Sequence, residues 1–232
     1  MHNIRNLLDN FASSSASDRE LAVKIHNYVR DEIRFGFTRK FDLAEPEYTL
    51  EQGYGHSNPK GVLFTRLLKD VGINSQLHFI TTKKKFLEGA IPSFFYGLLP
   101  EEISHSYAEV NISGKYLKVD SYIVDKALHR AILNLLFEKN LHSGFGVYSG
   151  SSPEWDGKTN NFVQIKEKES ILEDHGSFEE PEDYFFKFSS YKHQFLGIQF
   201  SYALNLFSEL SPTPFEIWVN SELNHIRTGK TL

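Results

Sequence analysis

Three polar residues occur along the chain in the order nucleophile, base and carboxylate: Ser57, His105 and Asp120. Ser57 follows a segment punctuated by glycines and comes shortly before Pro59, a residue that favours the first turn of a helix. We therefore expect Ser57 or Asn58 to be a helix N-cap, with the side chain at position 57 facing the positive end of the helix dipole. A group that attacks a carbonyl carbon could use that position.

The histidine and the carboxylate belong to a predicted β-hairpin. Segments 105–112 and 115–120 alternate in the manner of strands around a tight Ser113-Gly114 turn. Positions 107 and 120 are then roughly opposite, so that His105 and Asp120 are diagonal neighbours within side-chain reach. A carboxylate in that place can accept an imidazole N–H and fix the histidine tautomer.

The elements that must position these residues follow from hydrophobic spacing and from capping and turn residues. A helix is predicted to open at Ser17 and Asp18 and to end before Gly36. The other predictions are a helix from position 57 that stops before Gly72, a strand at 76–82, a helix at 123–139, a surface loop at 143–153, an acidic stretch at 167–183, and helices at 191–210 and 215–227.

Length and charge limit the classes of protein to consider. At 232 residues the chain is long enough for a single domain, 1–232, with a core at about 18–122 and a C-terminal extension at about 123–232. A net charge of -5 provides no basic field for nucleic acid. No apolar run reaches the roughly 20 residues of a membrane span, and Met1 to Ser15 does not resemble a signal peptide. We expect a cytoplasmic protein that binds neither nucleic acid nor membrane.

Cysteine and histidine usage bears on the chemistry. The chain has no cysteine, which excludes disulfides, thiolate metal sites and a thiol nucleophile. Its ten histidines are scattered without the spacing of metal ligands. No metal and no cofactor is therefore predicted, and the fold must be stable on packing alone.

Taken together, the motifs resemble the transglutaminase-like superfamily, whose fold is related to papain-type proteases. The resemblance covers about Asp18 to Tyr122. It rests on Thr49-Leu50, Gly53, Gly55, Leu67-Leu68, Gly72-Ile73, His105, Glu109, Val110 and Asp120. It implies an α+β fold, papain-like and transglutaminase-like, with a nucleophile helix packed on an antiparallel β-sheet and with C-terminal helices.

Three departures from the family pattern affect the chemistry. Ser57 stands where the family has its cysteine, His56 where an aspartate is common, and Tyr107 in place of a tryptophan. A serine hydroxyl is not ionised by a helix terminus, so a general base must remove its proton during attack. With serine at position 57, whether natural or introduced in place of a cysteine, the protein is therefore expected to be inactive or very slow.

The resemblance implies acyl transfer or amide hydrolysis through a triad of the Cys-His-Asp type. The substrate would be a peptide, a protein or a small amide or amine, and His105 would protonate the leaving amine. Two alternatives stay open. The first is a pseudoenzyme that binds a peptide or protein partner in its cleft, and the second is a serine hydrolase that uses Ser57, His105 and Asp120.

Neighbouring residues complete the candidate site, each with a structural alternative. The candidate substrate contacts are His56, Gln52, Tyr107 and Glu109. Gln52 could donate to an oxyanion, although the backbone N–H of Ser57 is the better placed donor. On a strand Glu109 shares a face with His105, which favours a structural ion pair. Taken singly, Ser57 is typical of an N-cap.

Overall fold

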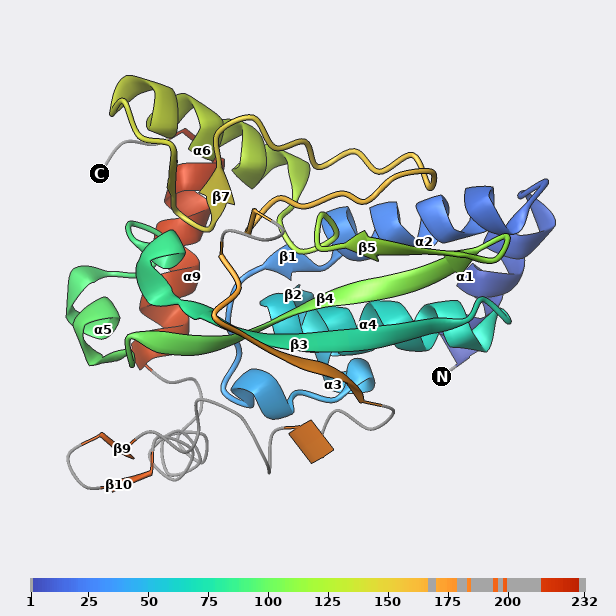
Figure 1. Ribbon diagram of the computed structural model, residues 1–232, viewed down its shortest axis with the longest axis horizontal. Coiled ribbons are helices and arrows are strands. Elements are labelled where there is room, and N and C mark those ends of the chain that lie inside the picture. The colour runs from blue at the N-terminus through green and yellow to red at the C-terminus, as the bar shows by residue number, and fades with distance from the viewer. Residues whose placement is uncertain are drawn as a thin grey trace.

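A four-stranded antiparallel sheet forms the centre of the protein, in a computed structural model that describes residues 2–166, 170–178, 183–184, 194–195, 198–199 and 214–229. The strands lie in the order β5-β4-β3-β8. Their bounds are Ser75–Lys83 for β3, Glu102–Ile112 for β4, Lys115–Val119 for β5 and Glu173–Phe178 for β8. Figure 1 shows the long strands β3 and β4 crossing the molecule, with α4 behind them.

The hairpin β4–β5 has the predicted register. Ala108 pairs with Val119, so position 107 lies opposite position 120. Ser113 and Gly114 form the turn with φ angles of 52° and 84°, and two successive positive angles match the right-handed twist of the flanking strands. The hairpin prediction is confirmed.

Helix α4, Ser57–Asp70, packs on this sheet at short range. Its apolar side chains Leu63, Phe64, Leu67 and Leu68 are buried. A Cβ atom at Gly61 would lie 2.6 Å from Leu77 Cδ1 and 2.9 Å from the Tyr122 hydroxyl, so only glycine allows the helix to approach so closely. The predicted α+β fold, a helix on an antiparallel sheet, is confirmed.

Further helices surround this core. The first two are α1, His2–Ser13, and α2, Asp18–Glu32. Ser17 caps α2 as predicted, because its side chain accepts the N–H of Glu20. Four short elements precede α4. In chain order they are β1, Arg34–Phe35, the 3-10 helix η1, Phe41–Leu43, α3, Pro46–Gln52, and β2, Tyr54–Gly55. Strands β1 and β2 pair in parallel. Beyond β3 come the 3-10 helix η2, Lys84–Leu87, and α5, Ser93–Leu98. Within the described part of the chain, every helix is too short or too polar to cross a membrane.

Two predicted helix starts are wrong by a few residues. The N-cap of α4 is His56, and Ser57 is the first helical residue. Pro59 still lies in the first turn, where its missing N–H costs no hydrogen bond. Helix α6 spans Lys126–Glu138 and not 123–139, because the Asp125 side chain accepts the N–H of Leu128 and caps the helix there.

Three segments after residue 142 contain strands that were not predicted. The predicted loop at 143–153 contains the short strands β6, Ser143–Gly144, and β7, Val147–Tyr148. The acidic stretch at 167–183 contains β8. Within the predicted helix 191–210, the described residues form the antiparallel strands β9, Gln194–Phe195, and β10, Ile198–Gln199, and the rest of that prediction lies outside the described residues. Apolar spacing in a short run does not separate helix from strand.

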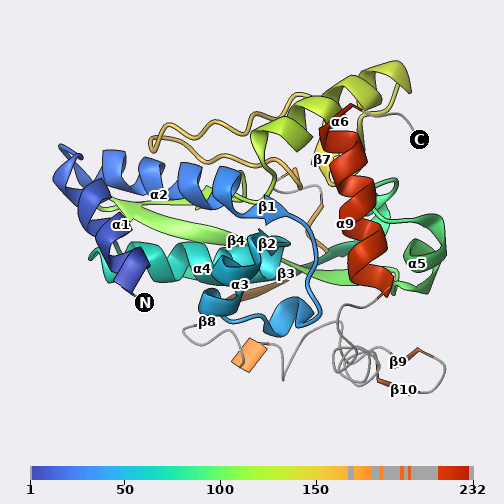
Figure 2. The ribbon, with the colours of Figure 1, turned by 180° about the vertical axis from the view of Figure 1, so that it is seen from behind.

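The C-terminal helix α9, Pro214–Arg227, confirms the prediction at 215–227 and returns to the core beside β1 (Figure 2). Asn220 accepts the N–H of Phe37 at 2.9 Å and donates to the Phe37 carbonyl at 2.7 Å. A Cβ atom at Gly36 would lie 2.6 Å from Asn220 Oδ1. Arg227 pairs with Asp125 at 2.8 Å and donates to the Phe35 carbonyl at 3.0 Å. Helix α9 therefore fixes the segment around Phe35 and Phe37.

Replacing Asn220 by leucine removes both bonds to Phe37 and leaves a backbone N–H and a carbonyl without partners. We expect the free energy of unfolding in urea to fall by about 2 to 3 kcal/mol. His225 is exposed on the same helix, and His225→Ala serves as the control, with a change within about 0.5 kcal/mol. Equal stability of the Asn220→Leu variant and the parent would show that the two hydrogen bonds from Asn220 to Phe37, here called the Asn220 clamp, contribute nothing to the free energy of unfolding.

Candidate active site

A cavity open to solvent lies at the N-terminus of α4. It has about 550 Å³ of empty volume, its mouth included. The polar side chains that line it are Asp42, His56, Ser57, Ser104 and Gln164. The apolar lining consists of Phe35, Phe37, Phe41, Phe86, Leu87, Ile91, Leu99, Pro100 and Ile103. One of the three residues predicted to be catalytic, Ser57, therefore faces a space in which a substrate could bind.

Ser57 is 6% exposed, and its hydroxyl makes no hydrogen bond to any described residue. As the first residue of α4, it stands beside backbone N–H groups that have no intrahelical partner. These N–H groups and the helix dipole favour negative charge at this point. The position suits a nucleophile whose attack creates an oxyanion.

His105 and Asp120 form a buried pair. Nε2 of His105 lies 3.7 Å from Oδ2 of Asp120, and the two side chains are 1% and 0% exposed. Three backbone N–H groups point at the carboxylate: Val163 at Oδ1, and Gln164 and Ile165 at Oδ2, at 3.2 and 3.4 Å. These donors compensate a charge that would otherwise be costly to bury. The carboxylate is thus fixed on the Nε2 side of the imidazole.

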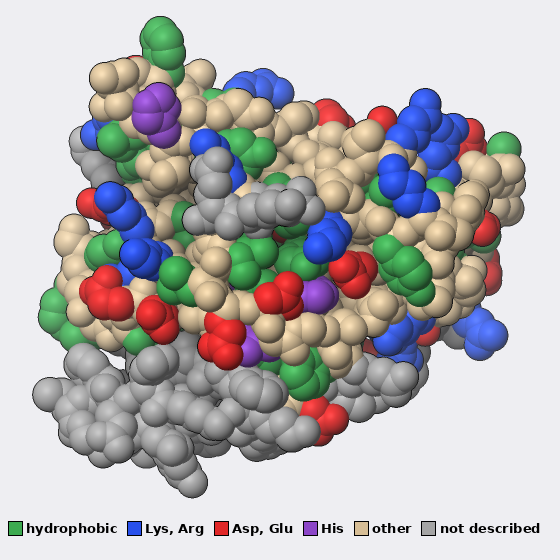
Figure 3. All heavy atoms as spheres, in the orientation of Figure 1, with side chains coloured by type: hydrophobic (Ala, Val, Ile, Leu, Met, Phe, Trp, Pro, Cys, Tyr) green, Lys and Arg blue, Asp and Glu red, His purple; other side chains and the backbone are tan. Residues whose placement is uncertain are grey.

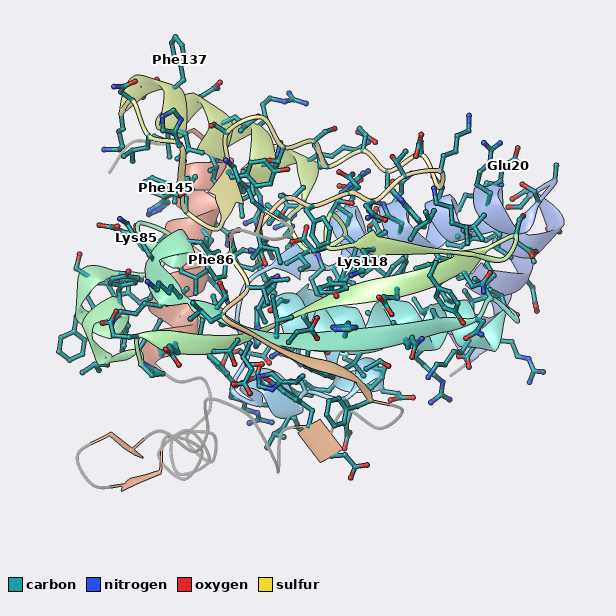
Figure 4. The ribbon with its side chains drawn as sticks, viewed as in Figure 1. Glu20, Lys85, Phe86, Lys118, Phe137 and Phe145 are labelled. Atoms are coloured by element: carbon teal, nitrogen blue, oxygen red, sulfur yellow. The ribbon has the colours of Figure 1, made fainter. Side chains whose placement is uncertain are left out.

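Neighbouring contacts join this pair to Ser57. Asn58 donates through Nδ2 to Ser104 Oγ at 3.2 Å, which links the residue after Ser57 to the residue before His105. The ring of Phe86, labelled in Figure 4, lines the cavity and lies 5.6 Å from the ring of His105. Gln164 lines the cavity with its side chain and binds Asp120 through its backbone. The contact between Asn58 and Ser104 therefore places the strand that carries His105 against the first turn of α4.

A second histidine and carboxylate adjoin Ser57. His56 Nε2 lies 3.3 Å from Asp42 Oδ1, and Asn58 donates to the same oxygen at 2.8 Å. The His56 ring stacks on Phe37, with centroids 5.1 Å apart and planes at 21°. Burial lowers the pKa of His56 against the opposing effect of Asp42. His56 is thus held as a neutral ring at the cavity wall.

The start of α4 is anchored from beneath by Lys60. This side chain is fully buried, and its Nζ donates to the carbonyls of Arg30, Ile33 and Ile123, the last at 2.7 Å. Burial lowers the pKa of Lys60 to about 7. One buried amine therefore ties the C-terminal end of α2 and the segment after Asp120 to the first turn of α4.

The other predicted substrate contacts do not line the cavity. Gln52 is exposed on α3. Tyr107 is buried and stacks on His78, with ring centroids 4.7 Å apart. Glu109 lies 3.7 Å from His78 Nδ1 and 4.0 Å from Lys118 Nζ, so it takes part in an ion pair network. Histidine and acidic side chains lie side by side on this face of the molecule (Figure 3), where Lys118 is also found (Figure 4).

Asp42, Gln164 and the phenylalanines that line the cavity were not predicted from the sequence to belong to the site. Asp42 lies in the short 3-10 helix η1, where no spacing pattern marks a site. Gln164 lies 44 residues beyond Asp120 and reaches the cavity only because the chain doubles back to bind that carboxylate. No local signal identifies either residue. Among the described residues, no three histidine, aspartate or glutamate side chains are grouped to hold a metal ion.

A further histidine supports the segment that carries Asp120. His26 is fully buried in α2, and its Nε2 lies 2.8 Å from the hydroxyl of Ser121. Its ring packs against Trp155 with centroids 5.4 Å apart. Burial is the main cause that lowers the pKa of His26 to about 3. The folded protein therefore keeps this imidazole neutral.

Comparison with known proteins gives one match. The family described as Transglutaminase-like superfamily matches residues 5–121, about half of the chain. That span contains Ser57, His105 and Asp120, and it ends before the segment 163–165 that holds Asp120. No curated protein and no solved structure matches the chain.

The neutral state of His26 predicts a dependence of stability on pH. Between pH 6.5 and about 3 the unfolded chain binds a proton at His26 that the folded chain does not, so stability is lost as pH falls through this window at up to about 1.4 kcal/mol per pH unit. We expect His26→Gln to reduce the pH slope of the unfolding free energy between pH 4 and 6. The exposed His225→Ala variant should keep the parent slope, and an unchanged slope in His26→Gln would contradict the assignment.

Proposed function

The chain belongs to the transglutaminase-like superfamily, and from this premise we propose that its cavity carries out acyl transfer or hydrolysis at an amide or ester carbonyl, with residue 57 as the nucleophile. The observation that carries the proposal is the buried His105–Asp120 pair, held by three backbone N–H groups next to the helix end that presents Ser57. A buried carboxylate that faces a histidine ring is the arrangement that orients a general base in nucleophilic catalysis.

The geometry suggests a role for each nitrogen of His105. Because Nε2 faces Asp120, Nδ1 is the nitrogen left to accept the proton of the nucleophile. Asp120 is the positioning residue, since it fixes the orientation of the ring and stabilises the imidazolium. The backbone N–H of Ser57 and the N–H groups of the first turn of α4 are the donors for the oxyanion.

The proposed reaction has two steps, acylation of Ser57 and transfer of the acyl group to water or an amine. The oxygen of Ser57 forms a bond to the carbonyl carbon while its proton moves to His105. The tetrahedral intermediate collapses, the bond to the amine or alcohol breaks, and the leaving group takes that proton. In the second step water or an amine forms a bond to the acyl carbon and gives its proton to His105. The bond between the Ser57 oxygen and the acyl carbon then breaks, the acid or new amide leaves, and the Ser57 oxygen takes the proton from His105. Peptides, proteins and small amides or amines are the substrates this chemistry admits.

Serine makes the first step slow. A thiol at a helix N-terminus beside a histidine is ionised before the substrate arrives, whereas a hydroxyl must lose its proton during attack. We therefore propose a site whose surroundings are those of a thiol enzyme and whose turnover with Ser57 is low. A cavity that binds its ligand without turnover is the alternative that Ser57 itself favours.

The absence of cysteine allows a direct test. Ser57→Cys introduces a single thiol into the chain. We expect iodoacetamide to alkylate it with an apparent pKa at least about one unit below the thiol reference of ~8.5, because helix dipole and imidazolium both favour thiolate. Intact mass spectrometry over a range of pH measures the rate.

Two controls separate the effects of the helix end and of His105 on the pKa of the introduced thiol. Ser17→Cys places a thiol at the N-terminus of α2, where Ser17 is exposed and caps the helix, and it reports the effect of a helix end without His105. His105→Ala in the Ser57→Cys background should raise the apparent pKa toward the reference. If Ser57→Cys titrates like Ser17→Cys and does not respond to His105→Ala, the proposed catalytic arrangement is wrong.

The chain with Ser57 is tested with a fluorophosphonate, which phosphonylates activated serines. We expect slow labelling of Ser57, located by peptide mass spectrometry and abolished by His105→Ala, because the hydroxyl depends on the imidazole for deprotonation. No labelling of Ser57, together with an apparent thiol pKa of Ser57→Cys near the reference value of ~8.5, would favour binding without turnover.

A further inference from the structure

We propose that the cavity beside Ser57 selects an acyl group that carries an aromatic ring close to the reacting carbonyl. This inference rests on the proposed function, because it names the substrate class of the same site. The cavity wall has nine apolar side chains, four of them phenylalanines, and among the described residues that line it there is no lysine or arginine. The composition is that of a site for an apolar group with a single polar end.

Three rings beside Ser57 form a compact cluster. The centroid of Phe37 is 5.1 Å from that of His56 and 5.5 Å from that of Phe41, with planes at 21° and 28°. Phe41 also lies 4.9 Å from His56. Aromatic rings at such separations favour a further ring in an offset or edge-on position more than an alkyl chain of equal area. The cluster of rings therefore favours an aromatic group on the ligand.

Phe41 is held in a backbone conformation that phenylalanine rarely adopts. Its φ angle is 49°, in the left-handed region where a bulky side chain is strained. Its ring contacts Phe37, His56 and Phe215, the last with centroids 6.0 Å apart. Such strain is typical of residues at functional sites. Phe41 is accordingly the residue that we assign to selection of the ring.

Three polar side chains of the wall, Asp42, Ser104 and Gln164, are already hydrogen-bonded to other groups of the protein. Ser104 accepts from Asn58 at 3.2 Å, and Gln164 donates to the Gly146 carbonyl at 3.1 Å. Asp42 accepts from Asn58, and burial lowers the pKa of His56, so this ring brings no positive charge. The wall thus has few free partners for a polar side chain, and Asp42 opposes an anionic one.

The test uses haloacetamides of different side groups on the Ser57→Cys variant. We compare iodoacetamide with its N-benzyl, N-carboxymethyl and N-(2-aminoethyl) derivatives, and divide each rate by that of the exposed Ser17→Cys thiol. The N-benzyl reagent is expected to react at least about tenfold faster than iodoacetamide on this scale, and the N-carboxymethyl reagent more slowly than iodoacetamide.

Two variants in the Ser57→Cys background locate the effect. Phe41→Ala should reduce the ratio of N-benzyl to iodoacetamide rates at least fivefold. Phe137→Ala is the matched control, because Phe137 is 88% exposed on α6 and points away from the sheet (Figure 4), and it should keep the parent ratio. If circular dichroism shows that Phe41→Ala is unfolded, Phe86→Leu replaces it with the same expected fall.

The outcomes distinguish this inference from the proposed function. Fast alkylation by iodoacetamide at low pH with no gain from the benzyl group would overturn the ring selection and leave the catalytic proposal intact. Ordinary thiol behaviour with a retained benzyl preference would overturn the catalytic proposal and support the ring site. A preference for the aminoethyl reagent over the benzyl reagent would show that Asp42 governs selection, and would overturn the inference.

Discussion

The buried carboxylate of Asp120 is the constraint on which the site depends. A charge without access to water must be met by hydrogen bonds, and here the backbone of 163–165 supplies them. The chain must therefore leave the β5 strand, form α6 and the β6–β7 ribbon, and return alongside Asp120, where the Asp120 N–H also binds the Asn161 carbonyl. That return brings Gln164 to the cavity wall and encloses His105.

The cavity is built from segments that are far apart in sequence. Ser57 and His56 come from the start of α4, Phe86 from η2, Gln164 from the returning loop, and Phe37 from a segment that α9 clamps through Asn220. Each wall is fixed by a hydrogen bond or ring contact to another element. The rigidity of these contacts is what a site needs if its groups are to be positioned before a substrate binds.

The sequence predicted Ser57, His105 and Asp120 as one site because each lies in an element with local rules: a helix start marked by Pro59, and a hairpin whose period of two fixes which residues are neighbours. Asp42, Gln164 and Asn220 obey no local rule, since tertiary contacts alone bring them to the cavity. Strand β8, which pairs with β3, was not predicted because its acidic sequence lacks the apolar alternation that is typical of a strand. The start of α6 differs from its predicted position because the Asp125 side chain caps the helix there, and apolar spacing alone does not identify such a cap.

The clamp from Asn220 to Phe37 has a consequence for biosynthesis. Ser57, His105 and Asp120 all emerge from the ribosome before α9 is made, and domains fold as the chain appears. Yet the wall that carries Phe35 and Phe37 is not fixed until residues 220 and 227 can reach it. A nascent chain thus contains the three predicted catalytic residues before one wall of the cavity is held in place.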